Sequence, residues 1–188
     1  FWDSRDKEWD DTAPAFEFLD THGYNYRWDK YVSDHVKYPE RIMIGTESIA
    51  MEALENWRLV KKYPHVIGDF VWTGMDYFGE SGLGYSVYVD PDVELRHTRP
   101  WPWFNAWCGD IDIIGNKKPQ SFYRDVVWGQ SQLEIAVHAP IPQGKKEIIS
   151  FWGWPDEELS WNWDGHEGEP FQVSVYSTLP TVRLELNG

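Results

Sequence analysis

The sequence predicts an α/β fold built on parallel strands, followed by a smaller all-β part. Between residues 20 and 77, short apolar strand patterns alternate with helical patterns, which is the order of βαβ units. The strand patterns are apolar almost throughout, which indicates a sheet that is buried on both faces. After Trp128, apolar residues fall at every second position between clusters of Pro, Gly and Asp, which indicates a small antiparallel sandwich.

The first part contains three predicted strands and two predicted helices. Residues 21–26 form the first strand, and apolar residues at helical spacing follow it until Pro39. Residues 41–47 form the second strand, and a second helical pattern follows and ends before Pro64. Residues 65–72 form the third strand. Because a helix connects each strand to the next, the three strands are predicted to lie parallel.

The rest of the chain is predicted to contain a long irregular connection, one helix and three short strands. The connection covers residues 78–118, and the helix after it has Pro119 in its first turn. We place the domain boundary near residue 130, which gives a first part at 1–130 and an incomplete sandwich at 131–188. The strands predicted in the sandwich are residues 132–138, 171–176 and 181–188.

Composition excludes several classes of function. The formal net charge of -14 and the pI near 4.7 disfavour binding to nucleic acid or to an anionic membrane surface. A single cysteine, Cys108, excludes an intrachain disulfide and a cysteine-built zinc site. No metal and no other cofactor is predicted, and no apolar run reaches the length of a membrane span.

The thirteen tryptophans are the outlier in this composition. Aromatic faces stack on the C–H faces of sugars, but large aromatic side chains also fill ordinary cores. Only tryptophans at strand ends or in loops are therefore candidates for a site. Four tryptophans of the second part are predicted to pack the sandwich or its contact with the first part, with a sugar-binding face as the alternative: Trp152, Trp154, Trp161 and Trp163. The acidic run at 156–158 is predicted to be a solvated turn.

Three residues stand at the ends of the three predicted parallel strands: Tyr26, Glu47 and Trp72. In a (β/α) barrel the carboxyl ends of the strands line one mouth, so these residues are predicted to converge. A carboxylate at the end of an apolar strand costs free energy unless it is paired or used, which makes Glu47 a functional candidate. Alternatively, Glu47 caps a helix that starts at Ser48, and both interpretations stay open.

Glycoside hydrolysis is a chemistry that suits a carboxylate among aromatic residues. In the retaining reaction one carboxylate attacks the anomeric carbon and a second protonates the leaving oxygen, with the two roughly 5 Å apart. Tyr26 could then donate a hydrogen bond to the nucleophile Glu47, and Trp72 could form the floor of the sugar site.

Several long motifs resemble one known family in the correct order. They are GYNY, YPERIMIGTES, YPHVIGDFVWTGMDYFGESG and WPWFNAWCGDIDIIGNKKPQSFYRDVVW. Together they resemble the C-terminal part of the catalytic barrel of glycoside hydrolase family 2, closest to its β-galactosidases. The final segment, WNWDGHEGEPFQVSVYSTLPTVRLELNG, resembles the start of the immunoglobulin-like domain that follows this barrel. The resemblance implies the last three βα units of a (β/α)8 TIM barrel, followed by an incomplete immunoglobulin-like sandwich.

The resemblance also implies a role for each strand-end residue. Glu47 matches the nucleophile at the end of the seventh barrel strand, Tyr26 the tyrosine that supports it, and Trp72 the tryptophan that stacks on the sugar. A non-proline cis peptide is expected between Trp72 and Thr73.

Two neighbouring residues are weaker candidates for substrate binding. Asn25 and Asp76 lie beside matched positions, where either could contact substrate or only fix a loop. Glu80, in the glycine-rich turn beyond them, is predicted to be a solvated loop carboxylate.

The sequence also departs from the family. The general acid/base of the family is a glutamate directly after an asparagine, and no Asn-Glu pair occurs in the 188 residues. A metal site described near that residue in some members is expected to be missing as well. We therefore expect a fragment that is inactive in isolation. An open sheet edge suggests that it associates with the remainder of the same polypeptide or with copies of itself.

The predicted function of the parent protein is retaining exo-hydrolysis of terminal non-reducing β-D-galactose residues through a covalent glycosyl-enzyme intermediate. A β-glucuronidase is the enzymatic alternative, because Asn116 and Lys118 match the Asn-x-Lys pattern that binds a substrate carboxylate there. We interpret both as loop and helix-start residues, since the pattern is short. Two interpretations without catalysis also stay open, namely a non-catalytic carbohydrate-binding module and a structural remnant. For a bacterial parent, a periplasmic or secreted location is favoured.

Overall fold

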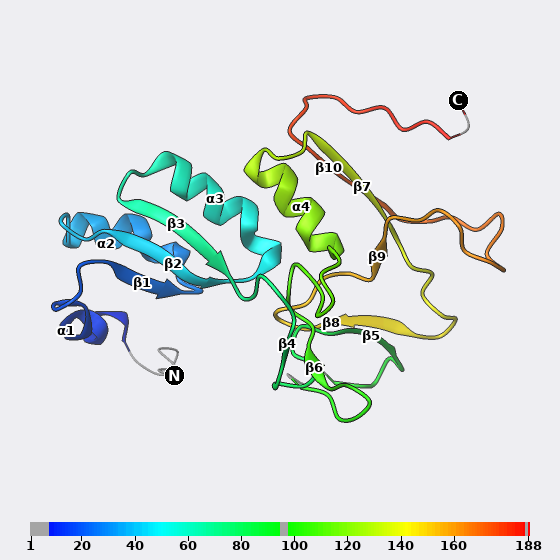
Figure 1. Cartoon of the computed structure of the whole chain (residues 1–188), viewed down its shortest axis with the longest axis horizontal. Coiled ribbons are helices and arrows are strands. Elements are labelled where there is room, and N and C mark those ends of the chain that lie inside the picture. Colours follow the sequence, from blue (N-terminus) through cyan, green and yellow to red (C-terminus); the bar gives the residue numbers. More distant parts are fainter. Residues whose placement is uncertain (1–7, 95–97, 187) are drawn as a thin grey trace.

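The computed structural model describes residues 8–94, 98–186 and 188. Its first part is a three-stranded parallel sheet with the order β1-β2-β3, covered by helices on one side (Figure 1). The strands are β1 (His22–Asn25), β2 (Met43–Ser48) and β3 (Val66–Val71), and the connecting helices are α2 (Tyr31–Lys37) and α3 (Ala53–Lys62). The three predicted strands and their parallel order are confirmed.

A short 3-10 turn precedes each α-helix described in this part. The turns are η2 (Trp9–Thr12) before α1 (Ala13–Phe16), η3 (Trp28–Lys30) before α2, and η4 (Ala50–Glu52) before α3. The second predicted helix therefore begins later than its sequence pattern indicates, because Ser48 still belongs to β2.

The core of the first part lies between the sheet and its helices. Tyr24, Tyr31, Met43 and Val66 are almost fully buried there. On β3, however, Ile67 and Phe70 have exposures of 55% and 62%, and Ile42, just before β2, has an exposure of 43%. The prediction that both sheet faces are buried is therefore not met within the described part of the chain, where helices cover one face only (Figure 1).

His35 of α2 has a structural role. Its imidazole ring stacks on that of His65, with ring centroids 3.6 Å apart and planes 9° apart. Burial, and after it the neighbouring His35, lowers the pKa of His65. The stacked pair joins α2 to the start of β3.

Residues 78–118 were predicted to form an irregular connection. They contain short strands instead of being irregular throughout. β4 (Tyr77–Phe78) pairs with β6 (Asn105–Ala106), and β5 (Ser86–Val89) pairs with β8 (Lys146–Ile149), both antiparallel. The partner of β5 lies about sixty residues downstream, so no local sequence pattern could predict the pair. The β5–β8 pair crosses the predicted boundary near residue 130.

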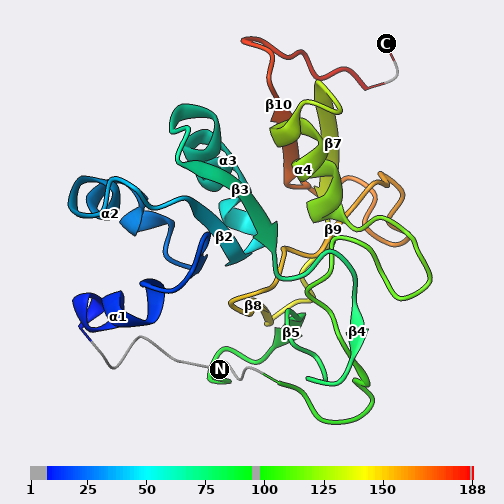
Figure 2. The same cartoon turned by 60° about the vertical axis from the view of Figure 1, so that its left-hand side comes forward.

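The last part of the chain combines one helix with a second small sheet. Helix α4 (Pro119–Trp128) leads into an antiparallel sheet with the order β10-β7-β9, which lies beside α4 in both views (Figures 1 and 2). Its strands are β7 (Leu133–His138), β9 (Glu157–Glu158) and β10 (Val173–Ser177). β7 and β10 confirm the strands predicted at 132–138 and 171–176.

Two predictions for this part are wrong. The segment predicted as a strand at 181–188 forms none in its described residues, and its apolar residues Val182, Leu184 and Leu186 are exposed. Alternation alone does not make a strand when no neighbouring strand pairs with it. The acidic run is not a solvated turn either, because Glu157 is only 4% exposed and accepts hydrogen bonds from Ser174 and Tyr176. Among the residues that the structure describes, no helix has the length and apolarity needed to cross a membrane.

Candidate active site

The carboxyl ends of β1, β2 and β3 bring the three predicted site residues to one edge of the sheet. In the register, Asn25 lies opposite Glu47, and Ser48 lies opposite Val71. The backbone continues this pairing beyond the strands, since the Tyr26 N–H donates to the Glu47 carbonyl at 2.7 Å. Trp72 N–H likewise donates to the Ser48 carbonyl at 2.8 Å.

Tyr26 and Glu47 form a direct side-chain pair. The Tyr26 hydroxyl donates to Glu47 Oε2 at 2.9 Å, and both side chains are half-buried. Tyr26 has φ of 55°, a left-handed conformation that is rare for a bulky residue and that turns the chain sharply after β1. Burial raises the pKa of the Tyr26 phenol, so it stays protonated and remains a donor to the carboxylate.

The helix-capping interpretation of Glu47 is wrong. The residue at the N-cap of the turn η4 is Ile49, and no side chain forms a capping hydrogen bond there. Glu47 instead belongs to β2 and accepts the hydrogen bond of a tyrosine from the neighbouring strand.

Trp152 also contacts this pair, although it was predicted to pack the sandwich or its contact with the first part, with a sugar-binding face as the alternative. Its indole Nε1–H donates to the Tyr26 hydroxyl oxygen at 2.7 Å, and the ring of Phe151 meets Tyr26 edge to face at 5.6 Å. Trp152 follows β8, which is held in place by β5. The sequence offered no local sign of this contact, because it depends on a strand pair between distant segments.

Trp72 lies next to the same cluster. Its peptide bond with Thr73 is cis, which confirms the expectation for this position. Its half-buried ring packs with Trp152 against the buried cluster that includes Cys108, and the edge of Tyr77 meets it at 5.9 Å. Both tryptophans therefore border the strand ends where Glu47 lies.

The loop beyond Trp72 presents one further carboxylate. Glu80 is exposed, as predicted, and accepts a hydrogen bond from the Tyr77 hydroxyl.

Asn25 is also exposed, and its Oδ1 accepts a hydrogen bond from the Thr46 hydroxyl at 2.6 Å. A contact of Asn25 with substrate stays a prediction.

Asp76 does not fit the predicted substrate contact. Its side chain is 0% exposed and forms an ion pair with Lys118, whose Nζ lies 3.0 Å from Asp76 Oδ1. The same carboxylate oxygen accepts the Gly109 N–H at 2.7 Å. Burial raises the pKa of Asp76 and lowers that of Lys118. The second interpretation of Asp76, that it fixes neighbouring loops, agrees with these contacts.

Both residues of the Asn-x-Lys pattern, Asn116 and Lys118, make structural contacts. Asn116 donates through its backbone and its side chain to the Asp112 carboxylate in a turn. Lys118 is the N-cap of α4, and its ammonium donates to Asp76 and to the Trp107 carbonyl. The interpretation of both residues as loop and helix-start residues is confirmed.

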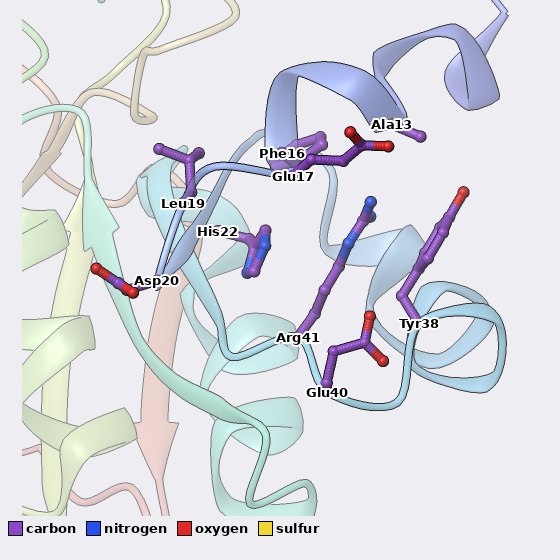
Figure 3. Close-up of a pocket in the computed structure, with 9 residues that line it drawn as sticks. All are labelled: Ala13, Phe16, Glu17, Leu19, Asp20, His22, Tyr38, Glu40 and Arg41. Carbon is purple, nitrogen blue, oxygen red and sulfur yellow. The ribbon is translucent and has the colours of Figure 1, made fainter.

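A pocket of about 360 Å³ lies at the opposite end of the sheet. It opens beside the starts of β1 and β2, between α1 and the turn before β2 (Figure 3). Arg41 crosses it, 3.6 Å above the ring of Tyr38, and forms an ion pair with Asp34 at 3.5 Å. The guanidinium is therefore already paired, and none of the strand-end residues lines this pocket. Within the described residues, no cluster of three or more potential metal ligands occurs.

The arrangement defines a class of protein, an α/β protein with a hydrogen-bonded carboxylate among aromatic residues at the carboxyl ends of parallel strands. Comparison with known proteins narrows this class. The crystal structure of a glycosyl hydrolase family 2 member from Bacteroides cellulosilyticus matches with a TM-score of 0.72 and 35% identity, over 94% of this chain and 22% of that chain. A second structure of a family 2 member, from B. cellulosilyticus DSM 14838, matches with a TM-score of 0.69 and 33% identity, over 91% of this chain and 19% of that one.

The chain is therefore a relative of glycoside hydrolase family 2, and it spans about a fifth of the length of these two solved members. A protein of Formosa agariphila named "Putative beta-glucuronidase" is 24% identical over 143 residues, which is 75% of this chain and 10% of that protein. No protein-family model matches the chain.

Proposed function

We propose that this chain supplies the nucleophile of a retaining exo-glycosidase. The observation that supports this most is the 2.9 Å hydrogen bond from the Tyr26 hydroxyl to Glu47, at the carboxyl ends of two parallel strands. Glu47 attacks the anomeric carbon and forms a glycosyl ester, while Tyr26 holds the attacking carboxylate in place. Trp72 stacks on the apolar face of the sugar ring. These roles rest on the contacts above and on the relationship to family 2.

The second carboxylate of the mechanism comes from outside this chain. Retaining hydrolysis needs an acid that protonates the leaving oxygen and then acts as a base toward water. The Asn-Glu pair of the family is absent from the sequence. We therefore propose that residues 1–130 form the last three βα units of a (β/α)8 barrel, and that residues 131–188 begin an immunoglobulin-like sandwich. The remaining barrel strands would supply the acid/base.

The proposed substrate is a terminal β-D-galactose residue. A β-glucuronidase is the second candidate, because the Formosa agariphila relative has that name. A glucuronide needs a cation for its carboxylate, and Lys118 is the lysine whose pattern suggested this role. However, the Lys118 ammonium is buried against Asp76 and the Trp107 carbonyl, so it is not available to a sugar. This contact favours the galactoside.

Hydrolysis of chromogenic glycosides tests the proposal. We expect the full-length protein that contains this chain to release nitrophenol from nitrophenyl β-D-galactoside at least about tenfold faster than from the β-D-glucuronide, since an uncompensated carboxylate costs more than about 1.4 kcal/mol. We expect residues 1–188 alone to release none, because the acid/base is missing. A faster reaction with the glucuronide would contradict the proposed substrate. Turnover by residues 1–188 alone at the full-length rate would contradict the fragment proposal.

A further inference from the structure

Trp152, Tyr26 and Glu47 form a continuous chain of hydrogen bonds. The Trp152 Nε1–H donates to the Tyr26 hydroxyl oxygen at 2.7 Å, and that hydroxyl donates to Glu47 Oε2 at 2.9 Å. Trp152 is 126 residues away from Tyr26 in the sequence, and it lies beyond the predicted boundary of the barrel. The site therefore includes a residue from the segment that follows β8.

The direction of this chain is fixed by the chemistry of its groups. An indole N–H only donates, and an ionised carboxylate only accepts. A phenol has a single proton, so it can accept from Trp152 and still donate to one partner. With the indole N–H directed at its oxygen, the Tyr26 proton is left for Glu47.

We propose that Trp152 is a positioning residue, which orients the Tyr26 hydroxyl so that its proton is directed at the nucleophile Glu47. This inference rests on the proposed function, because it assigns a role in the same site. Donors that accept a hydrogen bond themselves become stronger donors, so Trp152 also strengthens the bond that Tyr26 makes to Glu47. In agreement, the Trp152 hydrogen bond opposes the rise that burial causes in the pKa of Tyr26.

The backbone around Trp152 is held firmly enough for this role. Ser150 N–H donates to the Tyr85 carbonyl at 3.0 Å, and Gly153 N–H donates to the Ser150 carbonyl at 2.8 Å, which closes a tight turn around Trp152. A Cβ atom at Gly153 would lie 2.8 Å from the Tyr85 carbonyl oxygen, so the turn approaches β5 closely. Phe151 also packs edge to face on the indole, at 4.9 Å. Both views place β5 and β8 on the side of the sheet where the β3 arrow ends (Figures 1 and 2).

The test replaces Trp152 by Phe in the full-length protein and measures the pH profile of kcat/KM on the nitrophenyl glycoside that the wild type hydrolyses best. We expect kcat/KM to fall about three- to tenfold, which is the range for one hydrogen bond. KM should change by less than about twofold, because Trp152 acts through Tyr26 and not on the substrate. The acidic limb of the profile should move about 0.5 pH unit upward, since the nucleophile is then stabilised less as a carboxylate.

Trp154→Phe is the matched control. Trp154 lies in the same segment, and its Nε1–H donates to Glu157 at 2.8 Å, away from Tyr26. It should leave the acidic limb in place, whatever it does to stability. Replacement of Trp152 by β-(3-benzothienyl)alanine keeps the bicyclic shape without the N–H, and this variant serves if Trp152→Phe does not fold.

A double-mutant cycle with Tyr26→Phe separates positioning from packing. If Trp152 acts through the phenol, Trp152→Phe should change the acidic limb by less than about 0.1 pH unit in the Tyr26→Phe background. An equal shift in both backgrounds, or no shift in either, would overturn the positioning role while leaving the proposed function intact. Absence of glycosidase activity in the wild-type protein would instead overturn the proposed function itself.

Discussion

Glu47→Gln in the full-length protein is expected to lower kcat by about four orders of magnitude. Glutamine has nearly the same shape as glutamate, and its amide oxygen can still accept the hydrogen bond of the Tyr26 hydroxyl. The amide cannot form the glycosyl ester, so the attacking step is lost while the sugar site stays in place. The affinity for galactose should therefore change by less than about threefold, and kcat is the quantity to measure, with sugar affinity by calorimetry.

Glu52→Gln is the control for this variant. Glu52 is also a half-buried glutamate that accepts a hydrogen bond from an aromatic side chain, the indole of Trp28 at 2.8 Å, but it lies on η4 and its partner is not Tyr26. It should keep kcat within about twofold of the wild type. If the protein were a non-catalytic carbohydrate-binding module, Glu47→Gln would keep its sugar affinity and the wild type would have no turnover. A structural remnant would show neither sugar affinity nor turnover. Retention of kcat in Glu47→Gln would refute the nucleophile assignment.

Lys118→Met is expected to destabilise the protein by about 3–5 kcal/mol. The substitution leaves the Asp76 carboxylate buried without its cation, and only the Gly109 N–H remains as a partner among those described above. Burial already raises the pKa of Asp76 in the presence of Lys118, so the carboxylate is poorly solvated where it lies. Met keeps most of the apolar stem, and Lys118 makes no side-chain cap on α4 that would be lost.

The adjacent lysine provides the matched comparison. Lys117 pairs with Asp125 at the surface, where its side chain is 46% exposed, and such pairs contribute about 0–1 kcal/mol. We expect the midpoint of urea unfolding, followed by near-UV circular dichroism, to fall strongly for Lys118→Met and hardly at all for Lys117→Met. Equal midpoints for the two variants would show that the buried pair does not hold the loops around Trp107.

The sequence was sufficient to predict the first sheet and the convergence of Tyr26 and Glu47. Continuous apolar strands between helical patterns imply parallel order, and parallel order alone brings their carboxyl ends to one edge. The sequence did not decide between Glu47 as a nucleophile and Glu47 as a helix cap. The structure excludes the cap, because η4 begins at Ala50 and has Ile49 at its N-cap. Local pattern could not fix that boundary, because the first helical turn is 3-10.

The rest of the site depends on contacts that no local pattern contains. Trp152 reaches Tyr26 because β8 pairs with β5 about sixty residues away, and both strands are too short to stand out by periodicity. Asp76 was a candidate for substrate binding because of its neighbours in the sequence. Asp76 can be buried because it pairs with Lys118, 42 residues later. The Asn-x-Lys pattern had instead suggested that the charge of Lys118 binds a substrate carboxylate. Such pairs between distant residues follow from the tertiary fold.

The central claim is that Glu47 forms a covalent bond with the anomeric carbon of the sugar, and labelling with 2-deoxy-2-fluoro-β-D-galactosyl fluoride tests it most directly. Fluorine at C2 destabilises the oxocarbenium-like transition state, and fluoride leaves readily, so the glycosyl-enzyme accumulates. Mass spectrometry of the digested full-length protein should find one fluorogalactosyl group, esterified to Glu47. A label on a different carboxylate would contradict the claim. So would an enzyme whose turnover is unchanged after treatment with the reagent and whose Glu47 carries no label.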